Sequence, residues 1–331
     1  MLENMQFAGR ESVELKRAAA PVSGWHCRDE VIMGTSIRAE LWSEDAALGR
    51  SAIAAVMAEM HRIDRTMSPY KPDSELSRIN RDAARMPVTV SRELFDLIAC
   101  SLAFSEVSGG AFDITYASAG FLYDYRQKIR PTAEALAAAC AAIGYRKLVL
   151  DADALTVRFA QPGMRIDLGG FAKGHAVDNC AAILRRLGIA HAAVAAGGDS
   201  HVIGDRRGRP WTVGVRDPRR EGEVVALLPL EDAAVSTSGD YERYFEVDGE
   251  RCHHVIDPTT GRSPAGVRSV TVIAPDGLTA EALSKCVFVM GVQAGLRLVE
   301  SHAAVDAVVV DAAGALHYSS GLTGAGALTR Q

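Results

Sequence analysis

The chain has 331 residues, of which 48% are hydrophobic and 23% charged, and its formal net charge is -5. This length and composition are typical of a soluble globular protein with a substantial core. A negative balance argues against nucleic acid as the main partner, because such proteins need a basic face, and no apolar stretch is long enough to span a membrane. The six cysteines form no C-x-x-C pair, so we expect reduced thiols packed as small hydrophobes.

Residues 1–24 show no sustained periodicity, and we expect a poorly ordered lead-in. This segment also lacks the apolar core of a signal peptide, so the sequence as written predicts a cytoplasmic protein. Neither repeats nor low-complexity linkers interrupt residues 25–331. We therefore predict one compact domain there, with a division into two lobes as an open alternative.

The first half of the chain alternates between helical and strand-like spacing. Pro69 and Pro72 exclude helix between the first helix and the second. The expected elements are a strand at 31–41, a long amphipathic helix at 46–67, a short helix from Glu75, a short strand at 88–90, helices at 92–109 and 131–143, and strands at 148–150 and 156–159.

The stretch Ile166–Asp178 reads I-D-L-G-G-F-A-K-G-H-A-V-D. An apolar approach, two glycines and a segment of helical spacing predict a strand, a tight turn and a helix from about 174 to 187. Glycines let a ligand come close to the backbone, and the first helical N–H groups and Lys173 suit a phosphate or pyrophosphate. An ordinary strand-to-helix turn with a solvated lysine is the alternative at this point.

The second half of the chain is mostly sheet-like. The expected elements are strands within 192–215 around a polar hairpin at 205–209, two strands at 234–247 and 249–256 joined at Asp248-Gly249, a strand at 267–273, helices at 279–290 and 294–300, and closing strands at 307–310 and 317–319. Strands and helices are interleaved throughout, so we predict an α+β fold of mixed or antiparallel sheets with packed helices.

Several polar clusters fall at turns along this pattern, and each is ordinary turn chemistry when taken alone. In chain order they are M-G-T from Met33, S-P-Y-K-P-D-S-E-L-S-R-I-N from Ser68, G-G-A-F-D-I-T from Gly109, D-L-G-G-F-A-K-G from Asp167, A-G-G-D from Ala196, S-G-D-Y-E-R-Y-F from Ser238, H-H-V-I-D-P-T-T-G from His253 and A-E-A-L-S-K-C-V-F-V-M-G from Ala280.

Together and in this order, the clusters resemble the FAD:protein FMN transferases, the ApbE family, from about Met33 to Asp311. The resemblance implies the ApbE-like fold and a reaction in which FAD is split at its pyrophosphate. The FMN half is joined through its phosphate to a threonine hydroxyl of an acceptor protein, and AMP leaves. The resemblance also implies Mg²⁺ on the pyrophosphate oxygens.

The resemblance assigns a role to particular residues of this chain. His254 is implied as the general base toward the acceptor hydroxyl, and Asp257 as the residue that orients its loop. Asp167 and Lys173 are implied to flank the diphosphate. The implied flavin and nucleotide contacts are Met33, Tyr70, Ala111, Phe112, Asp113 and Val255, and the implied metal positions are Gly170, Glu281, Ser284 and Lys285.

Two metal positions depart from the family pattern, in which an aspartate and a threonine stand where this chain has Glu281 and Lys285. Three interpretations remain open. Lys285 could point away while Glu281 still coordinates the metal, or its ammonium could replace the ion and neutralise the pyrophosphate directly. The two residues could also form only an i,i+4 surface ion pair.

A second departure is the loop 116–126, where relatives commonly have a proline and a tryptophan-bearing loop; we expect it to meet the acceptor and to allow a different target. A third is the lack of the lipoprotein or export signal that many relatives have. Two other functions stay open, namely a non-catalytic FAD-binding protein of the same fold and an FAD pyrophosphatase.

Overall fold

The computed structural model describes residues 24–220 and 222–324. The predicted lead-in lies outside the described residues except for Gly24, which begins the first strand. The strands are β1 (Gly24–Ile32), β2 (Thr35–Ser43), β3 (Val88–Thr89), β4 (Leu148–Asp151), β5 (Thr156–Phe159), β6 (Ala192–Ala196), β7 (Asp199–Ile203), β8 (Trp211–Arg216), β9 (Val224–Leu230), β10 (Ala234–Gly239), β11 (Tyr244–Val247), β12 (Glu250–His253), β13 (Val267–Ala274), β14 (Asp306–Asp311) and β15 (Leu316–Tyr318).

The helices alternate with these strands along the chain. They are α1 (Ala46–Met67), α2 (Glu75–Asp82), α3 (Arg92–Val107), α4 (Ala117–Gly120), α5 (Ala133–Cys140), α6 (Ala172–Arg186), α7 (Gly277–Met290), α8 (Val292–Glu300) and α9 (Ser320–Gly324), with short 3-10 turns η1 (Ile114–Tyr116) and η2 (Tyr145–Lys147). None of the described helices is both long and apolar enough to cross a membrane.

The centre of the fold is an eight-stranded sheet in the order β1-β2-β6-β7-β10-β13-β14-β15, in which every neighbouring pair is antiparallel. Helices α1, α6, α7 and α8 pack side by side on one face of it. Because the inward residues of α1 recur every three or four positions, the helix buries one stripe against the sheet, including Val56, Met60 and Ile63. The main core lies between these layers.

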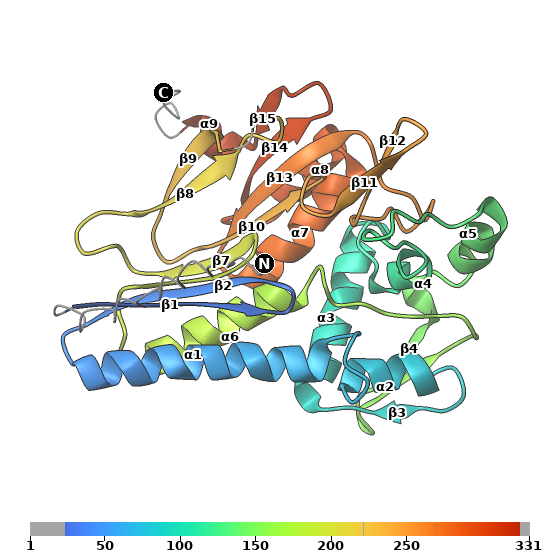
Figure 1. Ribbon diagram of the computed structural model, residues 1–331, viewed down its shortest axis with the longest axis horizontal. Coiled ribbons are helices and arrows are strands. Elements are labelled where there is room, and N and C mark those ends of the chain that lie inside the picture. Colours follow the sequence, from blue (N-terminus) through green and yellow to red (C-terminus); the bar gives the residue numbers. More distant parts are fainter. Residues whose placement is uncertain (1–23, 221, 325–331) are drawn as a thin grey trace, which may run out of the picture.

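Two smaller units complete the structure (Figure 1). The β8–β9 ribbon lies on the other side of the main sheet, where Trp211, Val215 and Leu228 form a second buried cluster with residues of the sheet. Helices α2 to α5 and the small sheet β3-β5-β4 gather beyond the end of α1. The antiparallel sheets and packed helices confirm the predicted α+β fold.

The structure corrects three of the expected strands. Residues 31–41 are not one strand: Met33 and Gly34 both have positive φ, so they turn the chain between β1 and β2. The expected strand 234–247 ends at Gly239 and resumes at Tyr244. The apolar approach to Asp167 is no strand either, because the Asn80 side chain takes the place of a neighbouring strand by bonding both the N–H and the C=O of Ile166.

Candidate active site

Two helix starts meet where the double-glycine stretch enters α6. The close approach depends on Gly174, because a Cβ there would lie 2.2 Å from the carbonyl oxygen of Gly277 at the start of α7. Because α6 and α7 approach each other closely at Gly174, the neighbouring Lys173 lies against Glu281, which is fully buried. Glu281 accepts hydrogen bonds from the Lys173 ammonium through one oxygen and from the Gly174 N–H, at 2.7 Å, through the other.

A second carboxylate completes this charged centre. Asp199, at the start of β7, is buried and lies 2.9 Å from the Lys173 ammonium. Burial opposes the charge on Lys173, but the two carboxylates outweigh that cost and raise the pKa of its ammonium. Burial, and then the charge of Asp199, raise the pKa of Glu281 while Lys173 opposes them. Lys173 is thus already neutralised within the protein.

Three serine hydroxyls link this centre to a second lysine. The hydroxyl of Ser236 donates to Asp199 at 2.5 Å, because strands β7 and β10 pair these two residues. Ser284 lies within hydrogen-bonding distance of Ser236 and Ser238. The Lys285 ammonium donates to the Ser238 hydroxyl at 2.7 Å. Burial lowers the pKa of Lys285, and the charge of Glu281 counteracts this.

These positions exclude one of the three sequence interpretations. Glu281 has no exposed surface and Lys285 is half-buried, so the two do not form a surface ion pair. Glu281 turns instead toward α6, and Lys285 forms no ion pair with a carboxylate within the described part of the chain. The surface-pair interpretation was wrong because α7 is covered by α6 and β10 along this face.

The double-glycine turn lies directly against the stem of Lys285. A Cβ at Gly170 would be 3.4 Å from two carbons of that stem. The preceding Asp167 accepts the N–H of Gly169 at 2.6 Å. Burial raises the pKa of Asp167, against the effects of that hydrogen bond and of the Lys173 charge. The backbone of the turn thus lies next to the Lys285 side chain, and the diphosphate site predicted there stays a prediction.

His254 follows the end of β12, and its N–H donates to the carbonyl of Arg243 at 3.1 Å. The ring is half-buried, and its Nδ1 is buried without a hydrogen-bond partner in the described structure. Burial, and then the nearby charge of Lys285, lower the pKa of His254 to about 3. The imidazole is therefore neutral at neutral pH and can accept a proton.

Asp257 builds the turn that follows His254. Its carboxylate accepts the N–H of Thr259 at 2.8 Å and the hydroxyl of Thr260 at 3.1 Å. Its backbone N–H donates to Arg262 across the same turn. In this structure Asp257 holds its own turn together, and its predicted orienting role stays a prediction.

Tyr70 and Met33, the two residues predicted at the flavin, are largely exposed and half-buried respectively. Tyr70 is 76% exposed and packs against Phe121, with ring centroids 6.1 Å apart. Met33 holds the tip of the β1–β2 hairpin in a left-handed conformation and packs partly on the core. The guanidinium of Arg243 donates to the carbonyl of Gly34 at 3.2 Å, so it ties this hairpin to the His254 segment.

Three other predicted contacts serve the fold in this structure. Phe112 is buried against Phe171 in an aromatic cluster, and Val255 is buried in the main core. Asp113 is buried, and its two oxygens accept hydrogen bonds from Thr115 and from the N–H of Tyr145. Ala111 lies half-buried beside them. The nucleotide contacts predicted for Ala111, Phe112, Asp113 and Val255 stay predictions, and the geometry of Asp113 explains its presence without them.

The sequence predicted no role for Asp199, Ser238 and Arg243, although all three belong to polar clusters of the resemblance. The signal was present in A-G-G-D and S-G-D-Y-E-R. Their roles follow from pairings between distant parts of the chain, because β7 lies beside β10 and Arg243 reaches back to the first hairpin.

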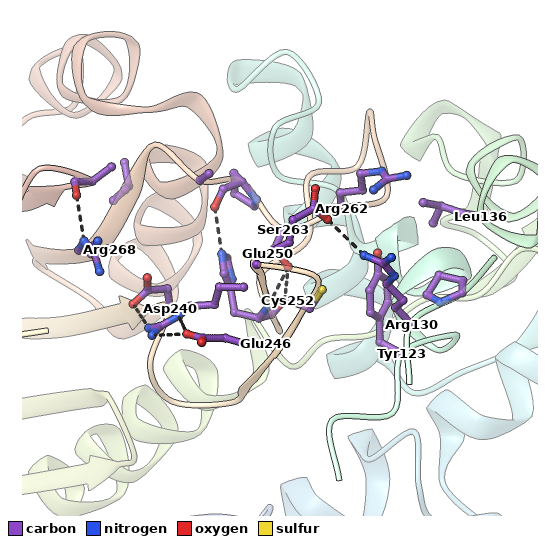
Figure 2. Close-up of a pocket in the computed structure, with 18 of the residues that line it drawn as sticks. Tyr123, Arg130, Leu136, Asp240, Glu246, Glu250, Cys252, Arg262, Ser263 and Arg268 are labelled. Atoms are coloured by element: carbon purple, nitrogen blue, oxygen red, sulfur yellow. Dashed lines mark hydrogen bonds and ion pairs between the residues drawn. The ribbon is translucent and has the colours of Figure 1, made fainter. Parts of the chain in front are cut away.

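A groove of about 800 Å³ lies behind the His254 segment. It runs between the β11–β12 hairpin and the segment that carries Tyr123 and Arg130 (Figure 2). His253 lines it from β12, and its Nε2 lies 3.0 Å from the carbonyl of Pro264. The hydroxyl of Tyr125 donates to the carbonyl of His253. His253 thus lines the groove, and the next residue, His254, lies near enough to Lys285 for that charge to act on its ring.

The antiparallel sheet with its helical layer, the double-glycine turn and the neutral histidine beside a lysine define an α+β protein built for an anionic ligand. The ApbE family profile matches residues 33–309. A FAD:protein FMN transferase from Treponema pallidum (strain Nichols) is 34% identical over 304 residues, which cover 86% of this chain and 84% of that protein. Another, from Klebsiella pneumoniae (strain 342), is 33% identical over 284 residues and covers 85% of this chain and 87% of its own length.

Solved structures give the same result. The crystal structure of the ApbE protein from Thermotoga maritima MSB8 aligns with a TM-score of 0.84 and 35% identity over 93% of this chain and 100% of that one. The flavin transferase ApbE from Vibrio cholerae aligns with a TM-score of 0.81 and 27% identity over 92% of this chain and 99% of its own. The chain belongs to the ApbE family.

Proposed function

We propose that this protein transfers the FMN moiety of FAD to a threonine hydroxyl of an acceptor protein. A bond forms between the threonine oxygen and the phosphorus of the FMN half. The bond from that phosphorus to the bridging oxygen of the pyrophosphate breaks, and AMP leaves with that oxygen. Family membership and the activity for which these relatives are named support this proposal.

The single observation that carries the chemistry is the environment of His254. Its neutral ring accepts the proton of the threonine hydroxyl as the new P–O bond forms. Burial, and then the charges of the cationic groups around it, Lys285 and Arg243 among them, lower its pKa in the ligand-free protein. An anionic diphosphate bound there offsets those charges, so FAD itself raises the basicity of His254 when a base is needed.

We place the flavin end of FAD beside Tyr70 and the tip of the β1–β2 hairpin. An exposed aromatic ring provides a flat surface for an isoalloxazine, and the half-buried side chain of Met33 adds apolar contact. The diphosphate then lies against the backbone of the double-glycine turn. Lys173 contributes by holding Asp199 and Glu281 in place, because its ammonium is already paired with both.

The resemblance also implied a magnesium ion at Gly170, Glu281, Ser284 and Lys285, and these residues do not fit it. Both carboxylate oxygens of Glu281 accept hydrogen bonds from protein groups, and the Ser284 hydroxyl donates to the carbonyl of Glu281 at 2.8 Å. Lys285 adds a positive charge. Mg²⁺ demands about six oxygens near 2.1 Å, whereas no group of three acidic, histidine or cysteine side chains suited to a metal occurs among the described residues.

The groove of Figure 2 is the place we propose for the acceptor protein. Arg130 and Arg251 in its lining pair with acidic side chains. Arg262 and Arg268 form no ion pair within the described residues, and Arg268 donates only to the carbonyl of Ala312. These two guanidiniums favour an acidic segment of the acceptor protein. Tyr123, from the loop 116–126 that departs from the family pattern, also lines the groove and donates to the carbonyl of Gly261.

Transfer is tested by co-expression with candidate acceptor flavoproteins and by flavin fluorescence of the denatured acceptor in a gel. We expect a fluorescent acceptor band that disappears when its threonine is changed to alanine. His254→Ala should lower the rate by about 100-fold or more, the range of general base catalysis. A rate within a few-fold of the wild type would refute the base assignment.

A second assay separates the two alternative functions. The protein is incubated with FAD alone, and AMP and FMN are measured. Release of both without an acceptor would identify an FAD pyrophosphatase, whereas bound FAD with no AMP, even with each candidate acceptor, would identify a binding protein. The cytoplasmic location predicted from the sequence is likewise a proposal, which fractionation of cells producing the protein would test.

A further inference from the structure

We infer that Lys285 is a built-in cation of this site, and that its ammonium contacts the FAD diphosphate in place of a divalent metal ion. The inference rests on the proposed function, since it names the group that neutralises the substrate. It concerns a residue at which this chain departs from the family pattern.

The position of the ammonium is fixed from two sides. Its stem lies against Gly170, where any side chain would press on it at 3.4 Å. Its Nζ donates to the Ser238 hydroxyl at 2.7 Å and lies 3.4 Å from that of Ser284. The ammonium therefore lies between the double-glycine turn and the end of β10, beside the backbone where the diphosphate is proposed to bind.

The two lysines of the site differ in what their charge already does. Lys173 contacts both Asp199 and Glu281, so little of its charge remains for a ligand. Lys285 donates to hydroxyl groups and forms no ion pair with a carboxylate among the described residues. An ammonium has three donors, and the hydrogen bond to Ser238 leaves others for phosphate oxygens. Lys285 is thus the cation with charge to spare.

The location also suits the reaction. Lys285 is the charged residue that acts most strongly on the His254 ring. The phosphorus under attack must lie within reach of a hydroxyl bound to His254, so its oxygens come near the same ammonium. A fixed positive charge at this point stabilises the negative charge that develops there during transfer.

Binding of FAD tests the inference separately from turnover. We would titrate FAD into the wild type by calorimetry, once in excess EDTA and once with MgCl₂. The expected dissociation constants agree within about two-fold. Lys285→Met keeps the length of the stem and removes the charge, and it should weaken binding by roughly ten- to a hundred-fold, the size of one charge-assisted contact. Lys285→Arg keeps the charge and should bind FAD more tightly than Lys285→Met.

Lys128→Met is the matched control, because it makes the same change at an exposed lysine. It should bind FAD like the wild type. Thermal melting of each variant shows whether it is folded. If Lys285→Met does not fold, a Mn²⁺ binding experiment on the wild type still decides the question. The EPR signal of free Mn²⁺ is measured in a solution of FAD with the wild type and in a solution of FAD without protein. We expect the same signal in both, because the protein should not bind the ion.

The outcomes separate the inference from the proposed function. A wild type that binds FAD only with Mg²⁺, or that takes up Mn²⁺ with FAD, overturns the inference and leaves the flavin transferase standing. Equal affinity of Lys285→Met and the wild type overturns it as well. A wild type that does not bind FAD under either condition refutes the proposed function itself.

Discussion

The low pKa of His254 predicts a specific loss of stability in acid. The ring titrates near 6.5 in an unfolded chain and at about 3 in the folded protein. Between these values the unfolded state binds more protons than the native state, so the free energy of unfolding falls as the pH falls through this window. From pH 7.5 to pH 4.5, this one group should lower the free energy of unfolding by roughly 2–3 kcal/mol.

The comparison is between the wild type and His254→Gln, which keeps a polar side chain but does not titrate. Urea unfolding of both at pH 7.5 and pH 4.5 gives the difference of differences, in which the other titrating groups cancel. We expect the wild type to lose roughly 2–3 kcal/mol more than the variant over this range. Equal losses, within about 0.5 kcal/mol, would show that the fold does not lower the pKa of the His254 ring.

Three further predictions concern packing, charge and docking. Gly174→Ala forces α6 away from the Gly277 carbonyl and should lower the free energy of unfolding in urea by about 1–3 kcal/mol. The control Gly266→Ala adds a Cβ in open space and should change this free energy by no more than about 0.5 kcal/mol. Equal effects of the two variants would contradict the close contact. Lys173→Met leaves two buried carboxylates unpaired and should lower the free energy of unfolding by about 3–5 kcal/mol at pH 7. Part of this loss should be regained in mild acid, because those carboxylates then bind protons. A loss that does not change with pH would count against the pairing. Exchanging Arg262 and Arg268 for glutamate should slow flavin transfer by roughly ten-fold or more, because like charges then repel an acidic acceptor segment, and should leave FAD affinity unchanged. An unchanged transfer rate would show that the acceptor does not bind in the groove.

The sequence predicted most of the helices and the strands with clear periodicity. The long helix α1 has the predicted bounds because Asp45 caps its first turn and Pro69 follows its end. The hairpin at Met33 was missed because a left-handed methionine carries no turn signature. Strand β9 was missed because its exposed positions are apolar, among them Val224 and Leu227, which hides the alternation that marks a strand.

The candidate site was predicted at the level of motifs but not of contacts. Lys173 stands out in the sequence as a cation after two glycines, yet the sequence does not show that it is already paired. Its partners Asp199 and Glu281 lie 26 and 108 positions further along the chain by number, on a strand and a helix that only the assembled sheet brings together. Local patterns reveal which residues can do chemistry, whereas tertiary packing decides which of them remain available for it.

The two departures at Glu281 and Lys285 are therefore best understood as one change. Glu281 turns its carboxylate to Lys173 and Gly174, which removes it as a free ligand for a metal. Lys173 pairs with both Asp199 and Glu281, and Lys285 lies nearby on serine hydroxyls, so the formal charges of these four side chains sum to zero without any added ion. A divalent cation would add two uncompensated charges there, and burying unpaired charge is costly. An aspartate at position 281 would keep the charge with one methylene less, whereas a threonine at position 285 would remove a positive charge from this centre. This chain instead keeps the Lys285 ammonium beside the proposed place of the diphosphate.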